Sequence, residues 1–243
     1  MRIGIFGRGR LGSAVADAVR AEGHEVAFHI GRDGALPSGS VDGVIDASLA
    51  TAVEAHLDWA AERGVPLAIG VTGIDARALV DRAAGRIGLV IAPNFSLTVA
   101  LVARLAAVLA RYSSITPGFD PYILEKHHAR KLDAPSGTAK LLANRMLAQL
   151  TNKEGFSMPS ETPLTGRELC VSSLRVGDGA QSYHKIGIES RDEVLEVVHE
   201  ARTMAPAGRG AVHALQFLQG RKGAFSMDDV AREALSGVLG ALD

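Results

Sequence analysis

Residues 1–23, MRIGIFGRGRLGSAVADAVRAEG, set a G-x-G-x-x-G pattern between an apolar run and an amphipathic segment. The run RIGIFG is typical of a strand, and the segment from Leu11 is typical of a helix that stops at Gly23. The glycine pattern alone is weak, because glycines occur in many loops. Between a strand and a helix, however, it is the fingerprint of a dinucleotide-binding turn. The alternative is a strand–helix turn that binds nothing.

The glycines of this turn have separate expected roles. Gly7 allows the tight turn, Gly9 lets the backbone approach a pyrophosphate, and Gly12 permits close packing of the helix on the strand. The helix that follows offers unpaired N–H groups and the positive end of its dipole to phosphates. We therefore expect nucleotide phosphates to bind along residues 7–12.

Strand-like and helical segments alternate from this turn to about residue 98. The alternation predicts a doubly wound parallel sheet with helices on both faces, a Rossmann-like α/β domain. After Asn94 the strand-like runs no longer have long helices between them, which predicts a mostly antiparallel sheet in a second, mixed α+β domain. The strands expected there are 122–128, 168–176, 182–189 and 193–201, and the helices are 98–112, 136–150 and a closing helix at 210–220. A last amphipathic helix is expected over 226–242, capped by Ser226.

Composition limits the class of protein. The 243 residues carry a formal net charge of −1, so no basic excess points to nucleic acid or to an anionic membrane. No apolar stretch approaches the ~20 residues that span a bilayer, and the first residues predict a strand rather than a signal peptide. The single cysteine, Cys170, excludes an internal disulfide and a multi-cysteine zinc site. We expect a cytoplasmic protein.

The end of the second expected strand carries the residues that distinguish the two nicotinamide cofactors. The sequence there is FHIGRD, in which Gly31 stands where an acid would grip the adenine ribose of NAD, followed by Arg32 and Asp33. Glycine removes a carboxylate that would repel a 2′-phosphate, and arginine adds a cation that can hold one. The pattern favours NADPH over NADH. The alternative is an ordinary solvated loop.

Two further turns follow expected strands of the first domain, GVTG at 70–73 and APNFS at 92–96. Ligands of doubly wound sheets collect at the carboxyl ends of strands. We therefore expect these backbone segments, with Thr72 and Asn94, to line a nicotinamide pocket. The same residue types are also common in turns that bind nothing.

The segment YILEKHHARKLDAPSGTAKLL, residues 122–142, gathers proton donors and cations before a helix. Side chains alternate along a strand, so His127 shares a face with Glu125, and His128 lies on the other face. Lys131 follows in a loop, and Ser136 can cap a helix whose first residues offer free N–H groups to a carboxylate. A small acidic substrate that needs a proton would use all of these groups. The segment contains neither a zinc spacing of the H-E-x-x-H kind nor a G-x-S-x-G elbow, so we expect no metal and no serine hydrolase.

The run EKHHARKLDAPSGTA resembles the signature of the dihydrodipicolinate reductase family. GRGRLG, GVTG, APNFS, SLRVGD, YHKI, EVVHEAR and FSMDDV agree with that family in the same order along the chain. The resemblance implies that His127 is the proton donor/acceptor and Lys131 a second proton donor. It implies that the substrate-binding residues are His128, Gly137 and Thr138. The implied nucleotide-binding residues are Gly7, Arg8, Gly9, Arg10, Leu11, Gly12, Arg32, Gly70, Val71, Thr72, Ala92, Pro93, Asn94 and Phe95.

The resemblance also implies a domain division and a reaction. Residues 1–97 and 220–243 would form the dinucleotide-binding domain, and residues 98–219 the substrate-binding domain that builds a homotetramer. The expected reaction is reduction of a small cyclic imine bearing two carboxylates, with hydride from NAD(P)H and a proton from the protein. Arg175, Gly177 and His184 lie in matching segments, each with a structural ion pair or a domain contact as the alternative role. A related dehydrogenase of another imine or amino acid, and a nucleotide-sensing protein without catalysis, remain as rival functions.

Overall fold

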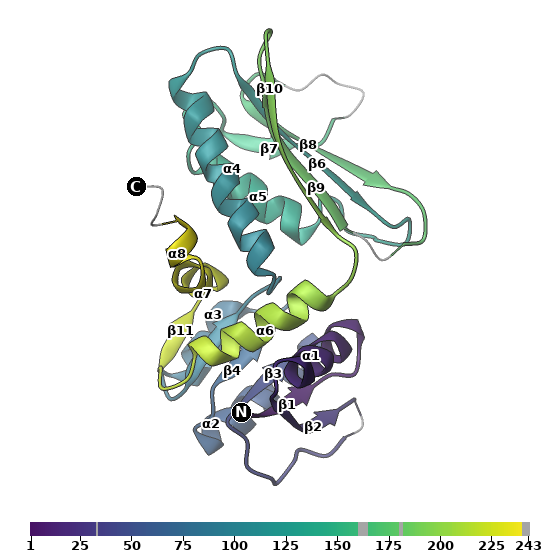
Figure 1. Ribbon diagram of the computed structural model, residues 1–243, viewed down its shortest axis with the longest axis vertical. Coiled ribbons are helices and arrows are strands. Elements are labelled where there is room, and N and C mark those ends of the chain that lie inside the picture. Colours follow the sequence, from purple (N-terminus) through teal and green to yellow (C-terminus); the bar gives the residue numbers. More distant parts are fainter. Residues whose placement is uncertain (33, 160–164, 180–181, 240–243) are drawn as a thin grey trace. The chain divides into compact units, whose positions relative to one another are not determined.

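The computed structural model of the chain describes residues 1–32, 34–159, 165–179 and 182–239. Asp33, named above beside Arg32, lies outside these residues. The chain divides into two compact units, Met1–Leu97 with Met204–Asp243, and Thr98–Thr203 (Figure 1). The first division falls where the sequence predicts it. The second falls at Met204 rather than at residue 220, so that prediction is wrong.

The first unit contains a six-stranded sheet in which every pairing is parallel. The strand order is β11-β5-β4-β3-β1-β2, which confirms the doubly wound, Rossmann-like sheet. Its strands are β1 (Arg2–Phe6), β2 (Glu25–Ile30), β3 (Gly43–Asp46), β4 (Leu67–Ile69), β5 (Gly88–Ile91) and β11 (Gly223–Phe225). The short β11, which the sequence analysis misses, returns to the sheet beside β5 after the whole second unit.

The helices of the first unit are α1 (Arg10–Ala21), the 3-10 turn η1 (Ala50–Ala52), α2 (Val53–Arg63), α3 (Ala76–Ala83), α6 (Ala205–Phe217), α7 (Met227–Ala234) and α8 (Ser236–Leu239). Of these, α1, α2, α3, α6 and α7 bury apolar residues, whereas η1 does not. Ser226 caps α7 as expected, in a capping box with Asp229. Two cores result, one on each side of the strands, built around Ile3, Ile5 and Leu215, and around Phe6, Leu57 and Leu89.

Helix α6 accounts for the wrong boundary at residue 220. The closing helix expected at 210–220 is present as α6, but it belongs to the first unit, because Ala211 and Leu215 pack in the same core as Val15 of α1. The two helices approach so closely that a Cβ on Gly208 would lie 2.3 Å from the carbonyl oxygen of Ala14. An apolar stripe in the sequence shows that a helix is covered, but it does not show which sheet covers it.

The second unit contains a five-stranded sheet with the order β10-β9-β6-β8-β7. Its strands are β6 (Asp120–His127), β7 (Gly155–Ser157), β8 (Glu168–Arg175), β9 (Ser182–Glu189) and β10 (Val194–Ala201), and its helices are α4 (Leu97–Ile115) and α5 (Gly137–Leu147). β9 is antiparallel to both β6 and β10, whereas β8 is parallel to β6 and β7. The sheet is therefore mixed, not mostly antiparallel, because α5 provides the crossover connection that a parallel pair needs.

Helix α4 has 19 residues and is long and apolar enough to cross a membrane by length and composition, with a mean hydropathy of 1.4 over an 18-residue stretch. The expectation that no apolar stretch approaches that length is therefore wrong. In the structure, α4 contributes to the core of the second unit, where Val102, Ala106 and Ala110 pack with residues of α5 and the sheet. Its apolar character has a structural explanation in this packing.

Candidate functional site

A polar row crosses the second sheet on the face that carries the core. The register sets Glu125 of β6 opposite Ser173 of β8 and His184 of β9, and His184 lies opposite His199 of β10. The row two residues earlier, with Ile123 opposite Val171 and Ile186, belongs to the apolar core. Polar side chains therefore replace the core near the end of β6.

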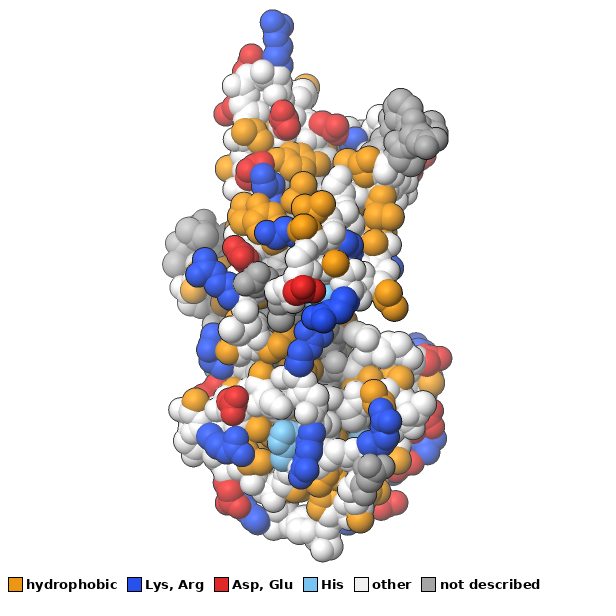
Figure 2. Space-filling view, turned by 90° about the vertical axis from the view of Figure 1, so that its right-hand side faces the viewer, with side chains coloured by type: hydrophobic (Ala, Val, Ile, Leu, Met, Phe, Trp, Pro, Cys, Tyr) orange, Lys and Arg blue, Asp and Glu red, His pale blue; other side chains and the backbone are white. Residues whose placement is uncertain are grey.

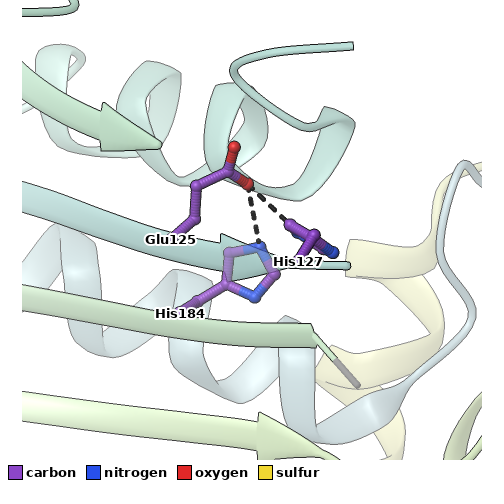
Figure 3. A group of neighbouring side chains, drawn as sticks. All are labelled: Glu125, His127 and His184. Atoms are coloured by element: carbon purple, nitrogen blue, oxygen red, sulfur yellow. Dashed lines mark hydrogen bonds and ion pairs between the residues drawn. The ribbon is translucent and has the colours of Figure 1, made fainter. Parts of the chain in front are cut away.

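Glu125 is completely buried and accepts hydrogen bonds from several elements. Its Oε1 accepts from the backbone N–H of Ser136 at 2.9 Å, the hydroxyl of Ser173 at 2.7 Å and Nη2 of Arg175 at 2.8 Å. Its Oε2 lies 3.1 Å from Nε2 of His127 and 3.6 Å from Nε2 of His184 (Figure 3). Burial alone would raise the pKa of Glu125, but the hydrogen bonds from the two histidines and the two serines lower it below its usual value. Glu125 is therefore an ionised carboxylate.

His127 ends β6 with its side chain 11% exposed. Its placement beside Glu125 confirms the shared face expected from strand alternation. Nε2 of the ring is directed at the carboxylate, and the second ring nitrogen, Nδ1, points away from it (Figure 3). The sequence pattern predicts that Glu125 lies on this face, but it does not indicate that Glu125 is the centre of the cluster.

The amino end of α5 lies against the same carboxylate. Ser136 caps the helix as expected, because its hydroxyl accepts from the N–H of Ala139 at 3.1 Å. That hydroxyl also lies 3.3 Å from Nε2 of His184. Gly137 is exposed and has open space at its Cβ position, and Thr138 is half-buried. The helix therefore begins with an accessible backbone, which is fixed by the cap at Ser136 and by the hydrogen bond from the N–H of Ser136 to Glu125.

Lys131 lies in the loop between β6 and α5, where its ammonium binds the carboxylate of Asp133 at 2.6 Å. This contact lowers the pKa of Asp133, against the opposing effect of partial burial. Arg175 joins the loop to the buried cluster, because the Nη2 that binds Glu125 also donates to the carbonyl oxygen of Asp133 at 2.7 Å. The structure thus links His127 and Lys131 through Glu125, Arg175 and Asp133.

Glu125, His127 and His184 are residue types that bind metals, and their potential ligand atoms lie within 4.8 Å of one another. The guanidinium of Arg175 already binds the carboxylate of Glu125, so a metal cation bound there would be repelled by its positive charge. Three donors already use Oε1 of Glu125. The contacts fit a hydrogen-bonded network better than a metal site.

A pocket of about 700 Å³ lies in the first unit at the carboxyl ends of β1, β2 and β3. β1 pairs with β2 on one side and with β3 on the other. The strands that follow β2 in the chain are therefore added to the sheet on the opposite side of β1. Such a switch point is where doubly wound sheets bind ligands. The lining residues are Gly7, Arg8, Gly9, Ile30, Gly31, Arg32, Gly34, Ala47, Ser48, Leu49, Thr51, Ala52 and His56.

The glycines of residues 7–12 allow a tight turn between β1 and α1. Gly7 has a φ of +101°, and a Cβ there would lie 2.2 Å from the carbonyl oxygen of Ala47. A Cβ on Gly12 would lie 1.9 Å from the carbonyl oxygen of Gly7, which requires glycine for close packing. Gly9 has nothing within 4 Å of its Cβ position and leaves room at the start of α1. Arg8 is held beside this turn because its Nε donates to the carbonyl oxygen of His29 at 2.9 Å.

The other predicted nucleotide-binding residues do not line this pocket. Arg10 is exposed at the start of α1, and Leu11 packs against Gly70, which also faces the ring of Phe95. Val71, Ala92 and Phe95 are buried, with Ala92 and Phe95 in the core of the first unit. Thr72 and Pro93 are exposed, and Asn94 accepts from the N–H of Ser96 at 2.9 Å. Residues 70–72 and 92–95 follow β4 and β5, whereas the pocket follows β1, β2 and β3.

Family models for both parts of one enzyme match this chain. The model described as dihydrodipicolinate reductase, C-terminus, matches residues 97–231, and the N-terminus model matches residues 34–95. The chain is 36% identical to 4-hydroxy-tetrahydrodipicolinate reductase of Acidiphilium cryptum, over 95% of this chain and 97% of that protein. The chain belongs to the dihydrodipicolinate reductase family.

Solved structures show how widely the fold of this family member is shared. The dipicolinate-bound dihydrodipicolinate reductase from Paenisporosarcina sp. TG-14 superposes with a TM-score of 0.71 at 20% identity, covering 93% of this chain and 97% of that chain. Amine dehydrogenase from Mycobacterium smegmatis superposes with a TM-score of 0.58 at 12% identity, covering 94% and 95%. The fold alone therefore does not select the substrate, and the residues of the site must do so.

In this member of the reductase family a second polar group, not expected from the sequence, lies beside the pocket of the first unit. Asp46 is buried at the end of β3, and its Oδ2 lies 2.7 Å from Nδ1 of His56. The N–H of Ser48 donates to Oδ1 of Asp46, and the ring of His56 stacks on Phe6. The position of Asp46 at the end of the strand-like run VDGVID could have indicated this group. Its partner His56 lies ten residues away on α2, so the pair is not visible in a short sequence pattern.

Proposed function

We propose that this chain catalyses the NAD(P)H-dependent reduction of dihydrodipicolinate, formed from 4-hydroxy-tetrahydrodipicolinate, to tetrahydrodipicolinate in diaminopimelate and lysine biosynthesis. The chain belongs to the family, and the main support from its structure is the contact of His127 with the buried carboxylate of Glu125, next to the accessible start of α5. Together these groups offer a proton and an anion-binding backbone to one small molecule.

The pocket of the first unit fits the phosphates of a dinucleotide. Gly7 and Gly12 hold a tight turn, Gly9 leaves space for a pyrophosphate, and the first N–H groups of α1 are available to it. Arg8 and Arg32 line the pocket and place positive charge beside Gly31, where a 2′-phosphate would bind. When bound, the reduced nicotinamide supplies the hydride of the reaction. We propose that NADPH is favoured over NADH.

Hydride addition to a conjugated imine leaves an electron-rich enamine that must be protonated. In the proposed mechanism His127 donates this proton, and its contact with Glu125 holds the ring in place beforehand. Lys131 assists as a second donor, positioned by Asp133. His128, Gly137 and Thr138 bind the substrate, with the backbone N–H groups at the start of α5 donating hydrogen bonds to one of its carboxylates.

Replacing Arg32 with alanine is expected to weaken NADPH binding several-fold while leaving NADH binding nearly unchanged, because only NADPH carries the 2′-phosphate. The dissociation constants can be measured by fluorescence titration of each cofactor. Arg20→Ala is a matched control, since Arg20 is an exposed arginine of α1 whose ion pair is with Asp17. Equal losses for the two cofactors would show that Arg32 does not recognise the 2′-phosphate.

The activity can be tested with freshly generated dihydrodipicolinate and NADPH, following loss of the near-ultraviolet absorbance of the reduced cofactor. Turnover supports the proposal. Turnover only with another imine or amino acid would favour the related dehydrogenase. Cofactor binding without turnover on any of these substrates would favour a nucleotide-sensing protein.

We further propose a homotetramer located in the cytoplasm. Large apolar side chains are exposed at the strands of the second unit, and Figure 2 shows orange side chains gathered on its surface. Val194 and Val198, on the same face of β10, are 54% and 52% exposed. Exposed apolar clusters of this kind mark protein interfaces.

Val198→Glu is expected to shift the protein from tetramer toward smaller species, because burying an unpaired carboxylate in an interface is unfavourable. Analytical ultracentrifugation measures the change in mass. Val238→Glu, at an exposed position of α8, is the matched control. A wild-type protein that sediments as a monomer would contradict the assembly but not the proposed activity.

A further inference from the structure

Glu125 is a buried charge that the sequence does not mark as functional, yet it contacts β6, β8, β9 and the start of α5. We propose that Glu125 is a positioning residue that fixes the tautomer of His127, so that Nδ1 is the nitrogen that delivers the proton. This inference rests on the proposed role of His127 as proton donor.

The hydrogen bonds of Glu125 determine which nitrogen of His127 carries hydrogen at the carboxylate. The N–H of Ser136 and the guanidinium of Arg175 are donors only, so Oε1 of Glu125 must accept. An ionised carboxylate offers acceptors on both oxygens, so Oε2 must accept as well. The ring nitrogen 3.1 Å from Oε2 is Nε2 of His127, which therefore carries a hydrogen in both the neutral and the charged imidazole.

The proton must then leave from the other nitrogen. In the charged imidazole the Nδ1–H bond breaks, its electron pair stays on Nδ1, and the proton forms a new C–H or N–H bond on the reduced substrate. His127 remains as the neutral Nε2–H form, still bonded to Glu125. A proton from water restores the charged form. The hydrogen bond to Glu125 persists through the cycle, so the ring keeps one orientation.

The charged groups around the pair favour an orienting role over a purely electrostatic one. Arg175 of β8 binds Glu125 and offsets much of its charge. His184 of β9 faces the same carboxylate, and the ion pair of Lys131 with Asp133 lies beyond Arg175. On β10, burial lowers the pKa of His199, with a further contribution from His184, so His199 is neutral near pH 7. The specific contribution of Glu125 is therefore that it accepts a hydrogen bond from Nε2 of His127 and so orients the ring.

Glu125→Gln keeps the shape of the side chain and reverses one hydrogen bond. The amide oxygen can still accept from Ser136, Ser173 and Arg175, which keeps the start of α5 in place. The amide NH2 would replace Oε2 and donate to Nε2 of His127, which moves the hydrogen of the neutral ring to Nδ1. We expect kcat to fall on the order of 100-fold with little change in KM.

A readout independent of activity is the ¹⁵N NMR spectrum of the histidine rings, with His127 assigned by its loss in His127→Gln. Wild-type protein is expected to show the neutral Nε2–H form, and Glu125→Gln the Nδ1–H form. Glu196→Gln is the matched control, because Glu196 also accepts on this sheet, from Tyr122 and from Lys185, and should leave both readouts unchanged.

The outcomes separate the two proposals. A wild-type His127 in the Nδ1–H form, measured without any variant, would overturn the positioning role whether or not Glu125→Gln folds. An unchanged tautomer and unchanged kcat in a folded Glu125→Gln would also overturn it. A fully active His127→Gln would instead remove the proposed function of His127 itself.

Discussion

Replacing His127 with glutamine is expected to lower kcat on the order of 10²–10⁴-fold and to leave KM nearly unchanged. The reason is that glutamine keeps a polar side chain at the end of β6 but cannot transfer a proton near neutral pH. Steady-state kinetics with NADPH and dihydrodipicolinate measure both parameters. The thermal unfolding midpoint should remain close to the wild-type value, because His127 lies at the end of its strand rather than in the apolar core.

His24→Gln is the matched control for this experiment. His24 makes polar contacts with the N-terminus and with Gln216 in the first unit, and it has no proposed role in the reaction. A His127→Gln enzyme whose kcat stays within a few-fold of wild type would remove this histidine from the mechanism.

Gly7→Ala is expected to lower the free energy of unfolding by at least about 2 kcal/mol and to abolish NADPH binding. Two costs combine at this position. The backbone has a φ of +101°, which an alanine adopts only with strain, and the new Cβ would meet the carbonyl oxygen of Ala47 at 2.2 Å. Chemical denaturation and cofactor titration measure the two effects.

Gly9→Ala separates binding from stability in the same turn. Gly9 has a φ of −74° and nothing within 4 Å of its Cβ position, so alanine should cost less than about 1 kcal/mol of stability. The methyl group would still occupy space in the pocket and weaken NADPH binding. Unimpaired NADPH binding in Gly9→Ala would show that the pyrophosphate does not approach this glycine.

The predictions from sequence succeed where the evidence is local. The strand, the glycine turn and the helix of residues 1–23 are neighbours along the chain, so spacing alone identifies them. Strand alternation likewise places His127 and Glu125 on one face, two residues apart. The cap at Ser136 and the helix that starts at Gly137 follow from the same kind of short-range pattern.

The errors concern which elements pack together. The apolar stripe of α6 gives no indication that α1 is its partner, and the apolar length of α4 does not distinguish a core helix from a membrane span. The short β11 carries too few residues for a periodic pattern.

What the sequence by itself determined is the parallel α/β sheet, the glycine turn and the order of the chemical groups along residues 122–142. Only the tertiary structure decided that Glu125 lies opposite Ser173 and His184, which are 48 and 59 positions away in the chain. The period of side chains along a strand gives the face on which each one lies. It does not give the neighbouring strand or the register, and these bring Ser173 and His184 to the carboxylate that contacts His127.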